Sequence, residues 1–234
     1  MPRVIHLLHD AAALARMLAL ESPCCAQIAM STAGAPSAWG AFLDANPLGG
    51  AWIADTELPA RRIVSHSGTL ADTPFGDDPR TWMKPGHERL KAFCDDVEPA
   101  LRAHGRTLCF RPHHRHVLGD VHASVKLLRD RAGGPFEILL SPGDLLAPSM
   151  LGQAEDHLAR MFAHLGPIAA GVLLFDIATT AESAETGLLQ HRRLGEGLLP
   201  MPLVASLLAE HVPAETPLIL LPGALDEQRS LLGL

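Results

Sequence analysis

The sequence predicts an α/β protein that folds as a single (β/α)8 TIM barrel. Eight short apolar runs recur along the chain, most of them end in polar or turn-forming residues, and most are separated by enough residues for one amphipathic helix. The runs are Val4–Leu8, Ala26–Ser31, Ala51–Asp55, Arg62–Gly68, Thr107–His113, Phe136–Pro142, Gly171–Ile177 and Pro217–Gly223. In such a barrel the chemistry lies at the carboxyl ends of the strands, so polar residues that end these runs are the first candidates for a site.

Length and composition fit one compact barrel and exclude several other classes of protein. With 234 residues the chain is near the lower size limit of such barrels, and no linker divides it, so we expect one domain over residues 1–234. A net charge of −7 argues against a general nucleic-acid surface. No apolar stretch is long enough for a membrane span, and the four cysteines are too few for a disulfide framework. We expect a cytoplasmic protein without nucleic-acid or membrane partners, and the oligomeric state stays open.

The segments between the runs predict the helices. One helix is expected from Asp10, as its N-cap, to Leu20, and a short one from Ser37 to Ala45. Later helices are expected at His87–His104, after an N-cap at Asp120, at about residues 149–165, and from Pro202 onward. Only Thr56–Arg61 joins the third run to the fourth, which is too short for a helical crossover. Either the third helix is missing or reduced, or Ala51–Asp55 is not a barrel strand.

A long polar loop, Thr69–Gly86, follows the fourth run. Loops of this length in a compact domain are usually functional or disordered. The sequence does not decide whether this loop is an ordered lid over the end of the strand.

Five short motifs in the second half stand in a recognisable order. They are Ile63–Gly68, His104–Gly105, Leu140–Asp144, Gly171–Asp176 and Leu194–Gly197. Their order and spacing over residues 62–223 resemble the xylose-isomerase-like TIM-barrel superfamily of sugar and sugar-phosphate isomerases and epimerases. The resemblance implies the barrel fold and isomerase or epimerase chemistry on carbohydrate substrates.

Members of that superfamily hold a divalent metal with carboxylates and a histidine at the ends of strands five to eight, and those ligands are missing here. The expected Glu of strand five falls on Arg111, and the expected Asp and His of strand six fall on Ser141 and Asp144. The His of strand seven falls on Leu173, and the Glu of strand eight falls at or near Leu221. Leucine cannot coordinate a cation, and a fixed guanidinium would repel one. We therefore expect no cofactor and do not transfer the metal-assisted mechanism.

Arg111 reverses the charge at the barrel mouth, with the run His113–His116 close behind it. A guanidinium is suited to a carboxylate or phosphate, which predicts a small anionic carbohydrate-like ligand such as a sugar phosphate or sugar acid. The alternative is that Arg111 pairs with an acidic neighbour, for which Asp144, Asp176 and Glu196 are the candidates.

Proton transfer needs groups that titrate at the strand ends. His66 could act as a general base, or it could only position a substrate. Asp176 could accept a proton, or it could hydrogen-bond the backbone of the next loop. The candidate catalytic residues are therefore His66, Asp144 and Asp176, and the candidate ligand-binding residues are Arg111, His113, Ser141 and Glu196.

Three functions remain open at this point. The first is a metal-free isomerase, epimerase or lyase acting on carbohydrate-like substrates. The second is a non-catalytic descendant that binds a small ligand or a protein partner. The third is a metal-dependent hydrolase with relocated ligands, for which His6, His66 and His113 are the candidates, with Asp55 or Glu57 assisting.

Overall fold

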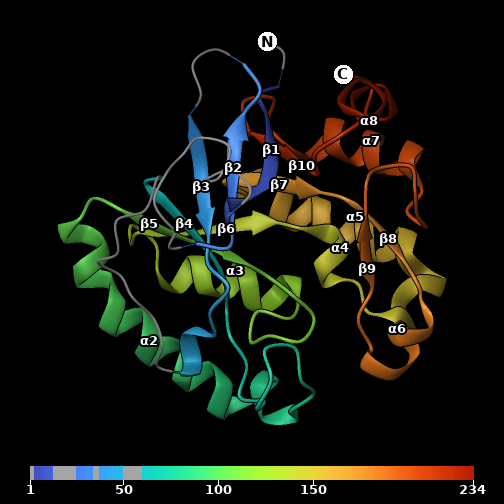
Figure 1. Ribbon diagram of the computed structural model, residues 1–234. Coiled ribbons are helices and arrows are strands. Elements are labelled where there is room, and N and C mark those ends of the chain that lie inside the picture. The colour runs from blue at the N-terminus through green and yellow to red at the C-terminus, as the bar shows by residue number, and fades with distance from the viewer. Residues whose placement is uncertain (1–2, 13–24, 34–36, 50–59) are drawn as a thin grey trace.

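A computed structural model describes residues 3–12, 25–33, 37–49 and 60–234. Eight strands of this part of the chain close into a barrel in the order β1-β10-β7-β6-β5-β4-β3-β2 (Figure 1). They are β1 (Ile5–Asp10), β2 (Gln27–Ser31), β3 (Ala38–Phe42), β4 (Arg62–His66), β5 (Thr107–Arg111), β6 (Phe136–Leu140), β7 (Gly171–Leu174) and β10 (Leu218–Leu220). The predicted eight-stranded barrel is confirmed.

One strand runs against the others. β2 is antiparallel to both of its neighbours, β1 and β3, whereas every other adjacent pair in the barrel is parallel. The barrel therefore departs from the all-parallel arrangement that the sequence predicts. The remaining seven strands end on the same side, and we call that side the barrel mouth.

The prediction for the third strand was wrong in position. Ala38–Phe42, which was expected to belong to a helix, is the strand β3, and it pairs with β2 and β4. Its large residues Trp39 and Phe42 are three positions apart, a spacing that also fits a helix face. The run Ala51–Asp55 lies outside the described residues. Between β3 and β4 the described residues form the 3-10 turn η1 (Pro47–Gly49).

The predicted helices of the second half are confirmed. They are α2 (Lys84–Ala103), α3 (Val121–Asp130), α5 (Ala154–Leu165) and α7 (Met201–His211). The Asp120 carboxylate caps α3 by accepting a hydrogen bond from the Ala123 amide at 2.7 Å, and Pro202 lies in the first turn of α7. Most of the helix predicted from Asp10 to Leu20 lies outside the described residues, and Asp10 itself is the last residue of β1.

Several short elements complete the chain. They are η2 (Pro79–Trp82), α4 (Pro142–Leu145), η3 (Pro148–Gln153), η4 (Gly166–Ile168), α6 (Ala181–Thr186) and α8 (Leu225–Leu231). The run predicted as one strand, Gly171–Ile177, is divided: β7 stays in the barrel, and β8 (Asp176–Ala178) leaves it. β8 pairs antiparallel with β9 (Gln190–Arg192), which forms a separate hairpin beside the barrel (Figure 1).

Alternate residues of the barrel strands fill its interior, while the helices cover the outside. Leu139, Leu173 and Ile219 are fully buried in the larger core cluster, which also takes in the apolar faces of α5 and α7. A second cluster joins α2 to β4 and β5. Cys94 and Cys109 are fully buried and pack as small apolar groups, as expected. Among the described residues, no helix combines the length and apolar character that a membrane span requires.

Candidate functional site at the barrel mouth

A buried ion pair lies at the centre of the mouth. Arg111 ends β5, and Asp144 lies on α4, the short helix directly after β6. The guanidinium donates from Nε to Asp144 Oδ2 at 2.5 Å and from Nη2 to Oδ1 at 3.1 Å. The two side chains are 10% and 1% exposed. Of the two alternatives for Arg111, the structure shows pairing with an acidic neighbour, Asp144, and capture of an anionic ligand stays a prediction.

Asp144 is ionised in this setting. Burial raises its pKa, but the Arg111 guanidinium and the hydrogen bond from His191 lower it by more, so the pKa of the carboxyl lies well below its usual range. The pair therefore brings one positive and one negative charge to the mouth rather than the surplus positive charge that the sequence suggested.

His191 is a site residue that sequence reasoning missed. It lies on β9, and its Nε2 is 3.2 Å from Asp144 Oδ1. Its ring packs on Phe175, with the centroids 3.9 Å apart. The side chain is 43% exposed, so solvent can reach the imidazole, while its Nε2 atom contacts the Asp144 carboxylate. No sequence pattern signals this residue, because the exposed run Gln190–Arg192 has the composition of a polar loop.

Three histidines form a second group, which we call the imidazole cluster: His66, His113 and His116. Their ring centroids are 4.7–5.5 Å apart. Phe75 packs against all three rings, with centroid separations of 4.8–5.4 Å. His113 and His116 are buried, and His66, at the end of β4, is partly exposed. The sequence predicted His66 and His113 as site residues, and the structure adds His116 and Phe75.

The hydrogen bonds assign the proton on each ring of the cluster. His66 Nδ1 is 3.0 Å from the carbonyl oxygen of Arg111, so it must carry a hydrogen, and Nε2 keeps the lone pair. His113 Nδ1 accepts from the amide of Arg115, and His116 Nδ1 accepts from the amide of Gly68. These two neutral rings therefore carry their proton on Nε2. His66 Nε2 is therefore the lone-pair nitrogen of the imidazole cluster to which no backbone amide of the described residues donates.

All three rings are neutral near pH 7. Burial lowers the pKa of His66 and His113 well below the usual value, and the Arg111 charge lowers that of His66 further. Burial also lowers the pKa of His116, to about 4. His116 Nε2 lies near the Pro74 carbonyl, yet no partner in the described residues meets hydrogen-bond geometry with it.

The pKa of His116 predicts a loss of stability in mild acid. Because the folded-state pKa is about 4 and that of an unfolded histidine is about 6.5, the unfolded state binds the proton first as the pH falls. The contribution of His116 is fully present above about pH 6.5, is lost between about pH 6.5 and 4, and amounts to about 3 kcal/mol over that range. Urea unfolding at a series of pH values should show a shallower decline for His116→Gln than for the wild type. An equally steep decline in both proteins would contradict the assignment.

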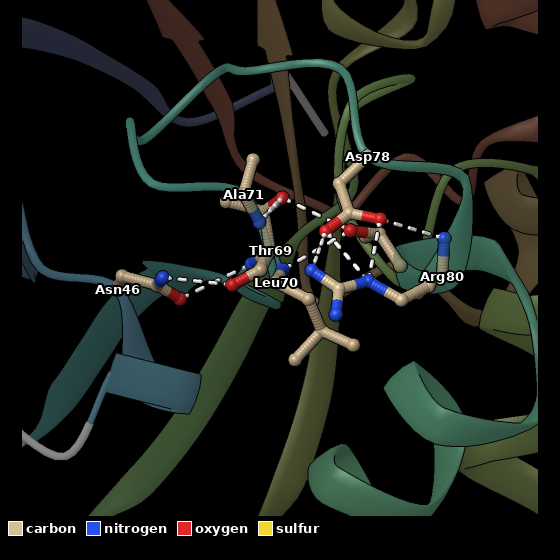
Figure 2. A network of polar contacts seen from close by, with 7 residues as sticks. Asn46, Thr69, Leu70, Ala71, Asp78 and Arg80 are labelled. Atoms are coloured by element: carbon tan, nitrogen blue, oxygen red, sulfur yellow. Dashed lines mark hydrogen bonds and ion pairs between the residues drawn. The ribbon is translucent and has the colours of Figure 1, made fainter.

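The loop that carries Phe75 is ordered. Thr69 and Thr81 close its base through an Oγ1–Oγ1 hydrogen bond of 3.1 Å. The Asn46 side chain donates to the Thr69 carbonyl at 2.8 Å and accepts from the Thr69 amide at 3.1 Å (Figure 2). At its far side Asp78 and Arg80 form an ion pair of 2.6 Å (Figure 2). Residues 69–82 therefore hold Phe75 against the imidazole cluster.

The predicted acidic residue of strand seven has a structural role. Asp176 is fully buried, and its two oxygens accept four hydrogen bonds from backbone amides. Oδ1 accepts from Ile177 and Leu199 at 2.8 and 2.9 Å, and Oδ2 accepts from Gly195 and Gly197 at 3.1 and 2.8 Å. We therefore assign Asp176 to holding the loop at residues 194–199, in place of proton transfer.

Two other predicted ligand-binding residues differ in their surroundings. Ser141 is fully buried after β6, and its Oγ has no hydrogen-bond partner among the described residues. Glu196 is exposed and pairs with Arg193 at 2.5 Å. Ser141 is therefore a buried hydroxyl at the mouth, whereas Glu196 belongs to the surface of its loop.

The residues of the mouth do not fit the metal that the sequence resemblance implies. Within the described ranges, no group of three or more His, Cys, Asp or Glu residues is placed to hold a metal ion. Of the relocated candidates, His66 and His113 lie side by side in the imidazole cluster, with ring centroids 5.5 Å apart, whereas His6 lies on β1 and is not part of that cluster. Asp55 and Glu57 lie outside the described residues.

No family model matches the chain, and neither does any curated protein. Solved structures of similar fold include a D-psicose 3-epimerase with D-fructose, at 15% identity and a TM-score of 0.46, covering 68% of this chain and 49% of that one. An L-ribulose 3-epimerase has 12% identity and a TM-score of 0.48, with 75% and 54% covered. A xylose isomerase-like TIM-barrel protein from Mycobacterium smegmatis, in complex with magnesium, has 11% identity and a TM-score of 0.47, with 75% and 61% covered.

Two of these structures are named as 3-epimerases and one as a xylose isomerase-like TIM-barrel protein. The chain spans about half to three fifths of their length. At these identities the likeness concerns the barrel and does not extend to an activity.

Proposed function

We propose that this chain is a metal-independent isomerase or epimerase that moves a proton on a small carbohydrate-like substrate at the barrel mouth. The observation that carries the proposal is the buried Asp144 carboxylate, which holds Arg111 on one side and His191 on the other. Reactions of this class need a positioned base that is open to the substrate, and they also need a group that binds the substrate oxygens.

His191 is the proposed general base. A neutral imidazole that donates Nε2–H to Asp144 keeps its lone pair on Nδ1. The Asp144 carboxylate fixes the ring and stabilises the imidazolium that forms when Nδ1 takes a proton, which is the role that a buried carboxylate plays beside a catalytic histidine. His191 can then remove a proton from a carbon next to a carbonyl and return it to the neighbouring carbon, which is isomerisation. For epimerisation, a proton must instead return to the opposite face of the same carbon.

His66 and Arg111 are the proposed substrate-binding groups. The neutral His66 offers Nε2 as an acceptor for a substrate hydroxyl, and its low pKa keeps it in that form at neutral pH. Asp144 engages Nε and Nη2 of Arg111, which leaves Nη1 to donate to a substrate oxygen. This arrangement suits a hydroxy-carbonyl compound. The substrates to test are ketoses, sugar phosphates and sugar acids.

Hydrogen exchange into the substrate tests the proposal. Each candidate compound is incubated with the protein in D2O containing a chelator, and the signal of the C–H next to the carbonyl is followed by proton NMR. We expect loss of this signal with at least one compound, and a rate about 10²–10⁴-fold lower in His191→Gln, as for removal of a general base.

The matched control is His104→Gln, because His104 is exposed and precedes the start of β5, whereas the mouth residue Arg111 is at the other end of that strand. Its exchange rate should equal that of the wild type. Exchange that appears only after a divalent metal is added would overturn the metal-independent mechanism. An unchanged rate in His191→Gln would overturn the role of His191.

A further inference from the structure

A cavity lies between α3 and α5. Its volume is about 480 Å³, which is within the range of small-molecule sites. Apolar residues from four elements line it: Val121, Val125, Leu145, Met150 and Met161. Two of these are methionines, whose flexible side chains adapt to ligands of varied shape. We call this cavity the α3–α5 groove.

The rim of the α3–α5 groove is rich in groups that donate hydrogen bonds or carry positive charge. His157, Arg160 and His164 lie three and four positions apart on α5, so they share one face of that helix. His122 faces them from α3. Asp120 is the acidic residue among those lining the groove, and its carboxylate is engaged as the N-cap of α3.

Arg160 is available to a ligand. Its ion pair with Asp156 measures 2.7 Å, but the two side chains are 67% and 56% exposed. Ion pairs with this exposure contribute little to stability, so an anion in the groove can replace Asp156 as the partner of Arg160 at small cost. The groove thus combines an apolar floor with a guanidinium and imidazoles at its edge.

We propose that the α3–α5 groove binds a small amphiphilic carboxylate, with its alkyl chain on the apolar floor and its carboxylate at Arg160 and the rim histidines. The charge of the rim selects the head group, and the apolar floor selects the tail. This site is separate from the barrel mouth and does not depend on the chemistry proposed there.

The indole of Trp82 lies beside the α3–α5 groove, so its fluorescence can report ligand binding. Gly119, which lines it, packs against the indole of Trp82, and a Cβ at Gly119 would lie 3.0 Å from Trp82 Nε1. Trp82 Nε1 donates to the carbonyl of His114 at 3.1 Å. A ligand that contacts Gly119 should therefore alter the fluorescence of Trp82.

Octanoate and octanol test the proposal, because they share the alkyl chain and differ in the charged head. Calorimetric titration below the micellar concentration should show that the wild type binds octanoate about tenfold more tightly than octanol. Arg160→Gln should remove this preference while leaving octanol binding unchanged. Met150→Trp, which fills the groove from its partly exposed edge, should weaken both.

The matched control is Arg129→Gln, since Arg129 is an exposed arginine on α3 that is not among the residues lining the groove. It should bind both compounds like the wild type. Octanoate should change the total tryptophan fluorescence of the control but not that of Trp82→Phe. Three results would each overturn the proposal: no octanoate binding, equal affinity for octanoate and octanol, or wild-type preference in Arg160→Gln.

Discussion

Replacing Asp144 by Asn is expected to lower the free energy of unfolding by about 3–5 kcal/mol, the usual cost of breaking a buried ion pair from one side. The Asp144 side chain is 1% exposed and that of Arg111 is 10% exposed, so the substitution leaves a guanidinium in the barrel without its counter-charge. His191 also loses the charged acceptor of its Nε2 hydrogen. Urea unfolding at pH 7 measures the change.

A double variant separates the stability contribution of the whole Arg111–Asp144 ion pair from the cost of leaving one charge unpaired. Arg111→Met with Asp144→Leu removes both charges and keeps similar volumes, so it should recover most of the stability that Asp144→Asn loses. Asp130→Asn is the surface control, because the ion pair of Asp130 with Lys126 is exposed and should contribute no measurable stability. If Asp144→Asn unfolds at the same urea concentration as the wild type, the pair is not buried as described.

Replacing Asp176 by Ala is expected to cost about 3–5 kcal/mol, because a buried donor that loses its acceptor costs about 1–3 kcal/mol and the effects are not additive. The carboxylate accepts four backbone hydrogen bonds with no exposed surface of its own. The loop at residues 194–199 should lose its conformation first. Hydrogen exchange at the amides of Gly197 and Leu199 would report that loss separately from global unfolding.

Two further variants make this test specific to the buried acceptor. Asp176→Asn keeps one acceptor oxygen and turns an amide toward the other donors, so its stability should lie between those of the wild type and Asp176→Ala. Glu196→Gln changes an exposed residue of the same loop and should leave the unfolding midpoint unchanged. A wild-type midpoint for Asp176→Ala would show that water replaces the carboxylate without loss.

The strand count and the second half of the fold could be predicted because buried strands separated by amphipathic helices leave a clear pattern. The third strand could not, since Trp39 and Phe42 fit a helix face as well as a strand, and β3 is only five residues long. The direction of β2 is decided by its pairing with β1 and β3, and the apolar pattern of the strand itself does not contain that direction.

The site was predictable only where it follows strand ends. Arg111, His66 and Asp144 come directly at or after β5, β4 and β6, and the barrel brings such residues together. His191 comes from a hairpin that folds back from outside the barrel, so its approach to Asp144 depends on tertiary structure alone. Whether Arg111 would pair with a ligand or a neighbour also depended on a distance that the sequence does not give.

The barrel closes where its first strand meets its last. Three residue pairs join β1 to β10, from Ile5 with Leu218 to Leu7 with Leu220, so this seam joins residues from near the two ends of the chain. Contacts between residues so distant in sequence carry a large loop-closure entropy and slow the folding of a domain. The antiparallel pairing of β1, β2 and β3 joins residues that are much nearer in sequence, so its loop-closure entropy is smaller. We therefore expect the N-terminal strands to assemble early as a local unit, and the seam between β1 and β10 to form later.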